Sequence, residues 1–240
     1  MTIMKNVKVV AFAAAAAVAG FSSAASAEDR EFTYSFNIGG YSDYVFRGLS
    51  LSGEKPVIQG GADIGWGSLY AGIWSSDLSD YAPGAEIDLY AGYKPVWNNI
   101  TFDFGFVQYL YTQNNGNLQY IELKAAASTE LAKNLTGGVT TWYQIDNSNV
   151  DAAFAVEGTL AYALPAMGPI SPTVSALLGH QSFDASTLDD YWYWNAGVTF
   201  GIEKLAIDLR YWDTDVNQNS ATAPGDGDSR FVASVKVTLP

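Results

Sequence analysis

Apolar and polar residues alternate along most of this chain, in segments of about ten residues that are separated by turn-forming residues. Alternation with a period of two is typical of β-strands, because successive side chains point to opposite faces of a sheet. The sequence contains twelve such segments, at 32–48, 56–66, 68–74, 86–97, 100–111, 118–128, 135–145, 152–164, 172–183, 190–202, 205–213 and 230–239. No proline-rich or charge-rich linker interrupts them, so we expect a single all-β domain over residues 28–240.

The connections between these segments alternate in length. One set is short, at 67–68, 98–99, 130–134, 166–171 and 203–204. The other set is longer, acidic and bears glycine or asparagine, at 49–55, 78–84, 112–117, 183–189 and 214–229, with 147–149 as its short member. Tight turns at one end and longer loops at the other are typical of outer-membrane barrels, with the turns on the periplasmic side. The pattern therefore predicts an antiparallel transmembrane β-barrel of about twelve strands.

A β-sandwich with one face in solvent would show the same alternation, so the aromatic residues must decide between the two folds. All 7 tryptophans lie near the ends of predicted strands and none lies at a strand centre. Membrane–water interfaces favour these positions, because the rings have an apolar body and a polar edge. We therefore predict membrane-interface positions for Tyr44, Trp66, Trp74, Trp97, Trp142, Trp192, Trp194 and Trp212.

The segment 42–50 (SDYVFRGLS) carries two different faces if it continues the first strand. We expect Tyr44 and Phe46 to face lipid, and Asp43 and Arg47 to face the lumen, where an arginine can find carboxylates. Asp43 with Arg47 and Asp208 with Arg210 are candidate ion pairs. The same alternation predicts a lumen lined by Asp43, Arg47, Glu86, Asp88, Lys94, Asp103, Glu122, Lys124, Glu157, Asp208, Arg210 and Lys236, with Asp63 beside them.

The first 27 residues have the features of a secretory signal peptide. Lys5 and Lys8 precede an alanine-rich apolar stretch, and the small residues Ala-Ser-Ala end at Ala27. We expect cleavage there, which removes two of the 12 basic residues and none of the 25 acidic ones. The acidic balance disfavours nucleic acid as a partner. The absence of cysteine excludes a disulfide framework.

The stretch 42–61 (SDYVFRGLSLSGEKPVIQGG), followed by LYAGIWSS and EIDLYAGY, resembles a bacterial family of TorF-type porins. The resemblance extends from Asn37 to about Tyr111 and is weak afterwards. It implies an outer-membrane barrel that acts as a porin. The family pattern falls on Ser42-Asp43-Tyr44, Phe46-Arg47-Gly48, Pro56, Gln59-Gly60, Tyr70, Gly72, Trp74, Glu86, Asp88, Tyr90, Gly92 and Tyr93.

The sequence also contains a possible hydrolase pair and a possible calcium-binding loop. His180 and Ser182 share a strand face and faintly resemble the His-x-Ser of lipid A deacylases, but a hydrolytic serine also needs an oriented base. Asp213, Asp215 and Asn217 copy the first ligands of a calcium loop. Gln218 and Pro224 then stand where glycine and a bidentate glutamate are required, so no EF-hand results. We expect no catalytic residue, no cofactor and no resident metal.

The sequence thus predicts a porin-like channel of the Gram-negative outer membrane for passive diffusion of small solutes or ions. Twelve strands lie between filled barrels of eight and open channels of 16 or more, so the pore should be narrow. Acidic lining residues outnumber basic ones, which predicts weak cation selectivity. Outer-membrane lipid, lipopolysaccharide and the outer-membrane assembly machinery are the expected partners. An outer-rim lipid hydrolase that uses His180 and Ser182, or a non-conducting structural barrel, are the alternatives.

Overall fold

The computed structural model describes residues 31–78, 84–112, 119–217, 222 and 227–240. The predicted signal peptide lies outside these residues, as do parts of three of the predicted long loops. The described chain contains no helix that is long and apolar enough to cross a membrane.

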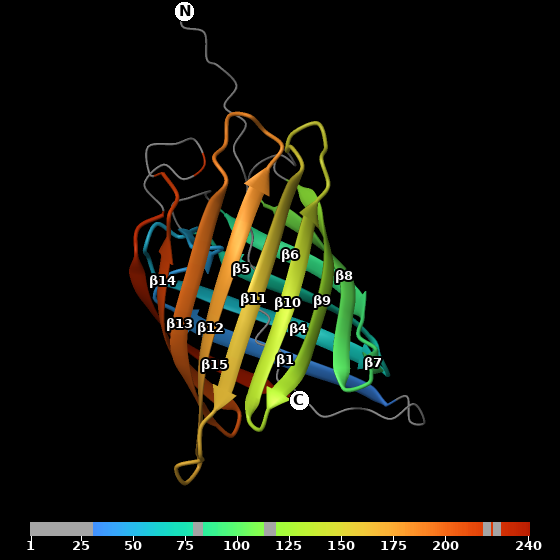
Figure 1. Cartoon of the computed structure of the whole chain (residues 1–240), viewed down its shortest axis with the longest axis vertical. Coiled ribbons are helices and arrows are strands. Elements are labelled where there is room, and N and C mark those ends of the chain that lie inside the picture. The colour runs from blue at the N-terminus through green and yellow to red at the C-terminus, as the bar shows by residue number, and fades with distance from the viewer. Residues whose placement is uncertain (1–30, 79–83, 113–118, 218–221, 223–226) are drawn as a thin grey trace, which may run out of the picture.

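Twelve long strands form an antiparallel sheet that closes on itself (Figure 1). The first strand pairs with the last, and β6 pairs with β8, so each of the twelve has two neighbours. The near and far walls cross one another in Figure 1, as the tilted strands of a closed barrel do. These strands are β1 (Phe32–Tyr41), β4 (Val57–Trp66), β5 (Leu69–Asp77), β6 (Ala85–Tyr93), β8 (Ile100–Tyr111), β9 (Tyr120–Ala132), β10 (Leu135–Gln144), β11 (Ala153–Ala163), β12 (Ile170–Phe183), β13 (Tyr191–Ile202), β14 (Leu205–Thr214) and β15 (Arg230–Leu239).

The predicted barrel is therefore confirmed, and each predicted segment overlaps one of these strands. A further pair of residues, β7 (Val96–Trp97), extends the connection between β6 and β8 and pairs only with β8. The short turns lie at one end of the barrel, together with the first residue of β1 and the last of β15. We call the half of the barrel nearer the longer loops the outer half, and the other the inner half.

The two faces of the wall differ in the way the alternation predicts. Large apolar side chains such as Phe36, Ile38 and Leu209 point outward and are at least half exposed. Their neighbours along the strand point inward, where Asp208 and Arg210 bind each other. An apolar outer surface around a polar interior is the arrangement that a lipid bilayer stabilises.

Glycines on the inner wall make room for tyrosine rings from neighbouring strands. A Cβ atom at Gly92 would overlap the ring of Tyr70, and one at Gly72 would overlap that of Tyr90. With glycine in place, the two rings lie against the wall and their hydroxyls reach charged groups on other strands. The tyrosines therefore narrow the inner half of the lumen without filling it with apolar atoms.

The segment 42–50 differs from the prediction. The first strand ends at Tyr41, and the chain then turns into the barrel as a small hairpin, in which β2 (Val45–Phe46) pairs with β3 (Leu49–Ser50). Its two central residues, Arg47 and Gly48, have φ of 46° and 85°. Two successive positive φ values are the geometry of a type I′ turn, whose twist matches a tight hairpin. The hairpin pairs with no strand of the wall, so it is an inserted element and not a continuation of β1.

We call residues 43–52 the plug. Every plug residue except the half-buried Val45 is buried. Its apolar side chains pack against wall residues in the outer half and form an apolar core inside the barrel. This core includes Tyr44, Phe46, Leu49 and Leu51 from the plug and Val57, Val107, Tyr109, Tyr111, Tyr120, Trp142, Ala155, Tyr191 and Tyr193 from the wall. The outer half of the barrel is thus filled, whereas the inner half is lined by polar groups.

Candidate functional site: the plugged lumen

Arg47 at the tip of the plug is held by a bidentate ion pair with the wall. Its Nη1 and Nη2 atoms donate to the two carboxylate oxygens of Glu122 at 2.8 and 3.0 Å, and Nη1 also donates to Oε1 of Gln181 at 2.8 Å. The exposed fractions of the two charged side chains are 4% and 1%. An arginine side chain is not deprotonated in proteins, and the attraction of Glu122 offsets the cost of burying its charge. Arg47 therefore stays charged and connects the plug to β9 and β12.

A second ion pair holds the base of the plug. Arg230 at the start of β15 donates to Oδ2 of Asp43 at 3.1 Å, and both side chains are buried. The other carboxylate oxygen of Asp43 accepts hydrogen bonds from Ser50 and Ser52 at 2.7 and 2.8 Å. Asp43 thus organises the hairpin internally while it binds the wall.

Glu86 and Asp88 lie beside the plug on β6, and both are completely buried. The hydroxyl of Tyr44 in the plug donates to Oε1 of Glu86 at 2.9 Å. Among the described residues, neither Oε2 of Glu86 nor either carboxylate oxygen of Asp88 has a hydrogen-bond donor. Neither carboxylate has an ion pair within that part of the chain.

Polar networks continue down the lumen into the inner half. Asp103 accepts hydrogen bonds from Tyr70 and Lys124 at 2.7 and 2.8 Å, and Lys94 lies 3.6 Å away. A similar network surrounds Arg210, which binds Asp208, Asn195 and Ser175. Glu157, nearer the plug, accepts hydrogen bonds from Trp142 and Tyr193. Asp63 accepts hydrogen bonds from Tyr90 and Ser35.

The structure places the side chains of all twelve predicted lining residues inside the barrel, two of them on the plug. Whether they line an open channel stays a prediction. The predicted pair of Asp208 with Arg210 is confirmed, at 3.0 Å. The predicted pair of Asp43 with Arg47 is wrong, because the hairpin turn sends the two side chains to different walls of the barrel.

Two residues of this site were missed by the sequence reasoning. Arg230 begins the last strand and shares the inward face with Lys236, so the alternation was the signal that could have found it. Gln181 is uncharged and was passed over between His180 and Ser182. Its position between two outward residues placed it on the inward face.

Four of the predicted interface aromatics lie inside the barrel instead. Tyr44 donates to Glu86, and Trp74 packs edge-on against Tyr44 with ring centroids 5.5 Å apart. Trp142 is 8% exposed and Trp212 packs against the apolar core of the plug. Phe46, which we expected to face lipid, is also in this core, with the Arg47 guanidinium 4.5 Å from its ring centroid. These aromatics lie on inward positions of their strands or on the plug, where they fill the outer half of the lumen.

The other four predicted interface aromatics point outward. Trp66, Trp97, Trp192 and Trp194 are exposed on the outer surface. Trp66 and Trp97 lie at the inner end of the barrel, and Trp192 and Trp194 lie at the outer end. Their contact with lipid headgroups stays a prediction.

His180 and Ser182 both point outward on β12, and each side chain contacts a residue other than its partner in the proposed catalytic pair. The imidazole of His180 packs against Trp192, with ring centroids 4.7 Å apart. The hydroxyl of Ser182 donates to the main-chain carbonyl of Phe154 at 3.2 Å. In this arrangement the imidazole does not activate the hydroxyl.

We therefore expect no fatty acid release when the purified protein is incubated with lipid A. His180→Ala and Ser182→Ala should leave folding and this lack of activity unchanged. Fatty acid release by the wild type that either substitution abolished would instead establish the hydrolase.

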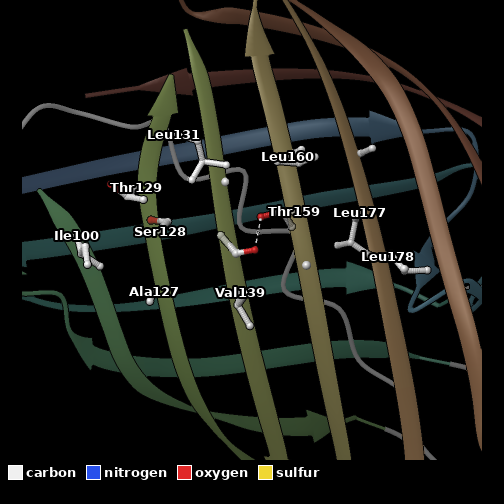
Figure 2. Close-up of a pocket in the computed structure, with 14 residues that line it drawn as sticks. Ile100, Ala127, Ser128, Thr129, Leu131, Val139, Thr159, Leu160, Leu177 and Leu178 are labelled. Atoms are coloured by element: carbon white, nitrogen blue, oxygen red, sulfur yellow. Dashed lines mark hydrogen bonds between the residues drawn. The ribbon is translucent and has the colours of Figure 1, made fainter. Parts of the chain in front are cut away.

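A shallow apolar hollow lies on the outer surface across β9, β10, β11 and β12 (Figure 2). Its volume is about 610 Å³. Exposed side chains of Leu131, Val139, Leu160 and Leu178 surround it, and small residues such as Gly137 form its floor.

Fold and interior together define the class: a twelve-stranded β-barrel with an apolar outer surface, a charged lumen and an internal plug. The chain belongs to the Gcw_chp family, described as a bacterial protein of unknown function, whose model matches residues 24–239. That description does not use the TorF name, so the resemblance to TorF-type porins stays a prediction. No curated protein matches the sequence with significance.

Solved structures of outer-membrane barrels share this fold. The KdgM porin is 7% identical, with a TM-score of 0.60, and the match covers 86% of this chain and 99% of that one. The NanC porin is 12% identical, with a TM-score of 0.57 and coverage of 85% and 99%. LpxR from Salmonella typhimurium is 11% identical, with a TM-score of 0.50 and coverage of 85% and 99%. At these identities the likeness concerns the fold alone.

Proposed function

We propose that this protein is a channel of the outer membrane for the passive diffusion of small solutes or ions, closed in its outer half by the plug. The observation that carries the proposal is the interior: a closed barrel surrounds charged and hydrogen-bonding side chains that continue from the plug to the inner end. A barrel that served only as a structural element could fill its lumen with apolar side chains. The fold shared with the KdgM and NanC porins supports the same role.

Location in the outer membrane is part of the proposal. The outward aromatics at both ends of the barrel fit the two headgroup zones, and lipopolysaccharide and phospholipid would cover the apolar belt between them. Insertion of such a barrel would require the outer-membrane assembly machinery. No cofactor is needed for passive diffusion.

Weak cation selectivity is also proposed, and the distribution of charge supports it. The outer half carries an excess of carboxylates, whereas the charges of the inner half are nearly balanced. In the outer half Asp43, Glu86, Asp88, Glu122 and Glu157 oppose Arg47 and Arg230, and in the inner half Asp63, Asp103 and Asp208 oppose Lys94, Lys124, Arg210 and Lys236. An ion that passes the outer half would meet a negative potential, which favours cations.

We expect rare, small openings of the wild-type protein in planar bilayers, because an ion can pass only when the plug moves. Under a KCl gradient free of divalent cations, the reversal potential should indicate a weak preference for K⁺. Glu86→Gln with Asp88→Asn should reduce this preference, because two charges of the outer half are removed. Asp208→Asn, in the balanced inner half, is the matched control and should change it less. Anion selectivity of the wild type would contradict the proposed role of the outer-half carboxylates.

A further inference from the structure

Glu86 and Asp88 form a buried pair of carboxylates that the channel proposal does not explain. They lie on the inward face of β6 with no exposed surface, and three of their four carboxylate oxygens have no donor among the described residues. Their carboxyl groups approach within reach of a hydrogen bond, yet ionised carboxylates have no hydrogen to donate. Two unpaired negative charges in a dry interior are costly and require compensation.

Among the described residues, the surroundings of the pair offer oxygen atoms and no cation that is not already bound elsewhere. On the wall, Asp88 lies directly opposite Tyr109 of β8, which in turn lies opposite Tyr120 of β9. The side chain of Tyr120 is 2% exposed, and its hydroxyl has no hydrogen-bond partner among the described residues. Arg47, the cation of the plug, already binds Glu122 and Gln181 through its terminal nitrogens.

A shared proton compensates this site less completely than a metal ion does. One proton between the two carboxyls satisfies one hydrogen bond and leaves one negative charge buried. A divalent cation neutralises both charges and accepts lone pairs from several oxygens at once. The unpartnered Tyr120 hydroxyl is a separate polar group that points to the same requirement, because a proton on the carboxyl pair gives it no partner.

We propose that Glu86 and Asp88 bind a hard divalent cation, with Ca²⁺ as the probe, on the wall of the lumen beside the plug. Carboxylate and hydroxyl oxygens are the ligands that such ions prefer. No group of three or more His, Asp or Glu side chains in the described structure could hold a metal. The site would thus have only two charged ligands, the carboxylates of Glu86 and Asp88, and the hydroxyl of Tyr120 would be a neutral one. Tyr44 of the plug binds Glu86, so the ion would also stabilise the seated plug. This site does not depend on whether the barrel conducts.

The test is the effect of Ca²⁺ on the unfolding temperature of the full-length barrel, refolded in a neutral detergent and first treated with a chelator. Unfolding is followed by the loss of the heat-sensitive fast-migrating band on gels. We expect saturable stabilisation, of about 5–10 °C when Ca²⁺ is at 100 times its dissociation constant. Glu86→Gln with Asp88→Asn should abolish this shift. Without Ca²⁺ the double variant should be more stable than the wild type, because it buries no unpaired charge.

The matched control is Asp63→Asn with Asp208→Asn, which removes two lumen carboxylates that already have donors. This variant should keep the full response to Ca²⁺. An equal response of the wild type and the Glu86/Asp88 double variant would mean ion binding elsewhere and would overturn the proposal. No response of the wild type, together with a pH dependence of its stability that the double variant lacks, would assign a shared proton instead. Asp88→Asn alone provides the same comparison if the double variant does not fold.

Discussion

Replacement of Arg47 by alanine is expected to destabilise the barrel by about 3–5 kcal/mol, because Glu122 would remain buried without its cation. Tyr109 still donates to this carboxylate at 3.0 Å, but a phenol does not neutralise the charge. The tip of the plug would also lose its connection to β9 and β12. We therefore expect a lower midpoint of urea unfolding and more frequent channel openings, with a stronger preference for cations.

A double variant separates the two effects. Arg47→Ala with Glu122→Gln removes the orphaned charge, so most of the lost stability should return, while the plug stays unlocked and the openings stay frequent. Arg210→Ala is the matched control, because its ion pair is more exposed than that of Arg47. The exposed fraction of the side chain is 17% for Arg210 and 23% for its partner Asp208. Water can reach that pair, and its loss should cost about 1 kcal/mol or less. An equal loss of stability in Arg47→Ala and Arg210→Ala would contradict the assigned role of burial.

The strands of the wall could be predicted from the sequence because a single physical rule determines them. A wall with lipid on one side and a polar lumen on the other requires an alternation of period two, and no tertiary contact within the wall overrides it. In β6, for example, Leu89 points outward and Asp88 inward, as the alternation requires. The register between strands could not be predicted in this way, because many registers satisfy the same alternation.

The plug could not be predicted, because its residues also alternate. Asp43, Tyr44, Val45 and Phe46 would suit a strand of the wall, and the turn is formed by Arg47 with Gly48 instead of the usual asparagine with glycine. An arginine at positive φ is uncommon and costs conformational energy. The bidentate bond of its side chain to Glu122, 75 residues away in the sequence, compensates for this cost. Such a long-range contact has no local signal.

The aromatic residues illustrate the same limit. The rule that tryptophans near strand ends lie in headgroup zones places Trp66 and Trp192 on the outer surface but misplaces Trp142 and Trp212. The ends of strands in the outer half have two apolar environments, namely the lipid outside and the plug inside. Position along the strand identifies the depth of a residue, and only its face distinguishes lipid from plug. For Trp212 that face was available from its neighbour two residues away, Arg210.

Removal of the plug is expected to have the largest effect on conductance. Residues 43–52 are to be replaced by a short glycine–serine linker that joins Ser42 to Gly53. The plug strands pair only with each other, so the twelve wall strands keep all of their neighbours. We expect a folded, less stable barrel that conducts continuously instead of in rare openings, because water would replace the apolar core of the outer half. Single-channel recording measures the conductance, and heat-dependent gel mobility verifies that the barrel has closed.

The matched control replaces residues 185–188, in the loop between β12 and β13, with a linker of the same composition. None of these four residues is buried, so the control alters an outer loop and leaves the plug in place. It should conduct as rarely as the wild type. Glu122 loses Arg47 and Arg230 loses Asp43 in the deletion variant. Arg230 keeps Glu54 as an ion-pair partner at 3.7 Å, and Glu122 would face water, where an unpaired charge is tolerated. A plug-free barrel that folds and still does not conduct would overturn the channel proposal and favour a structural barrel.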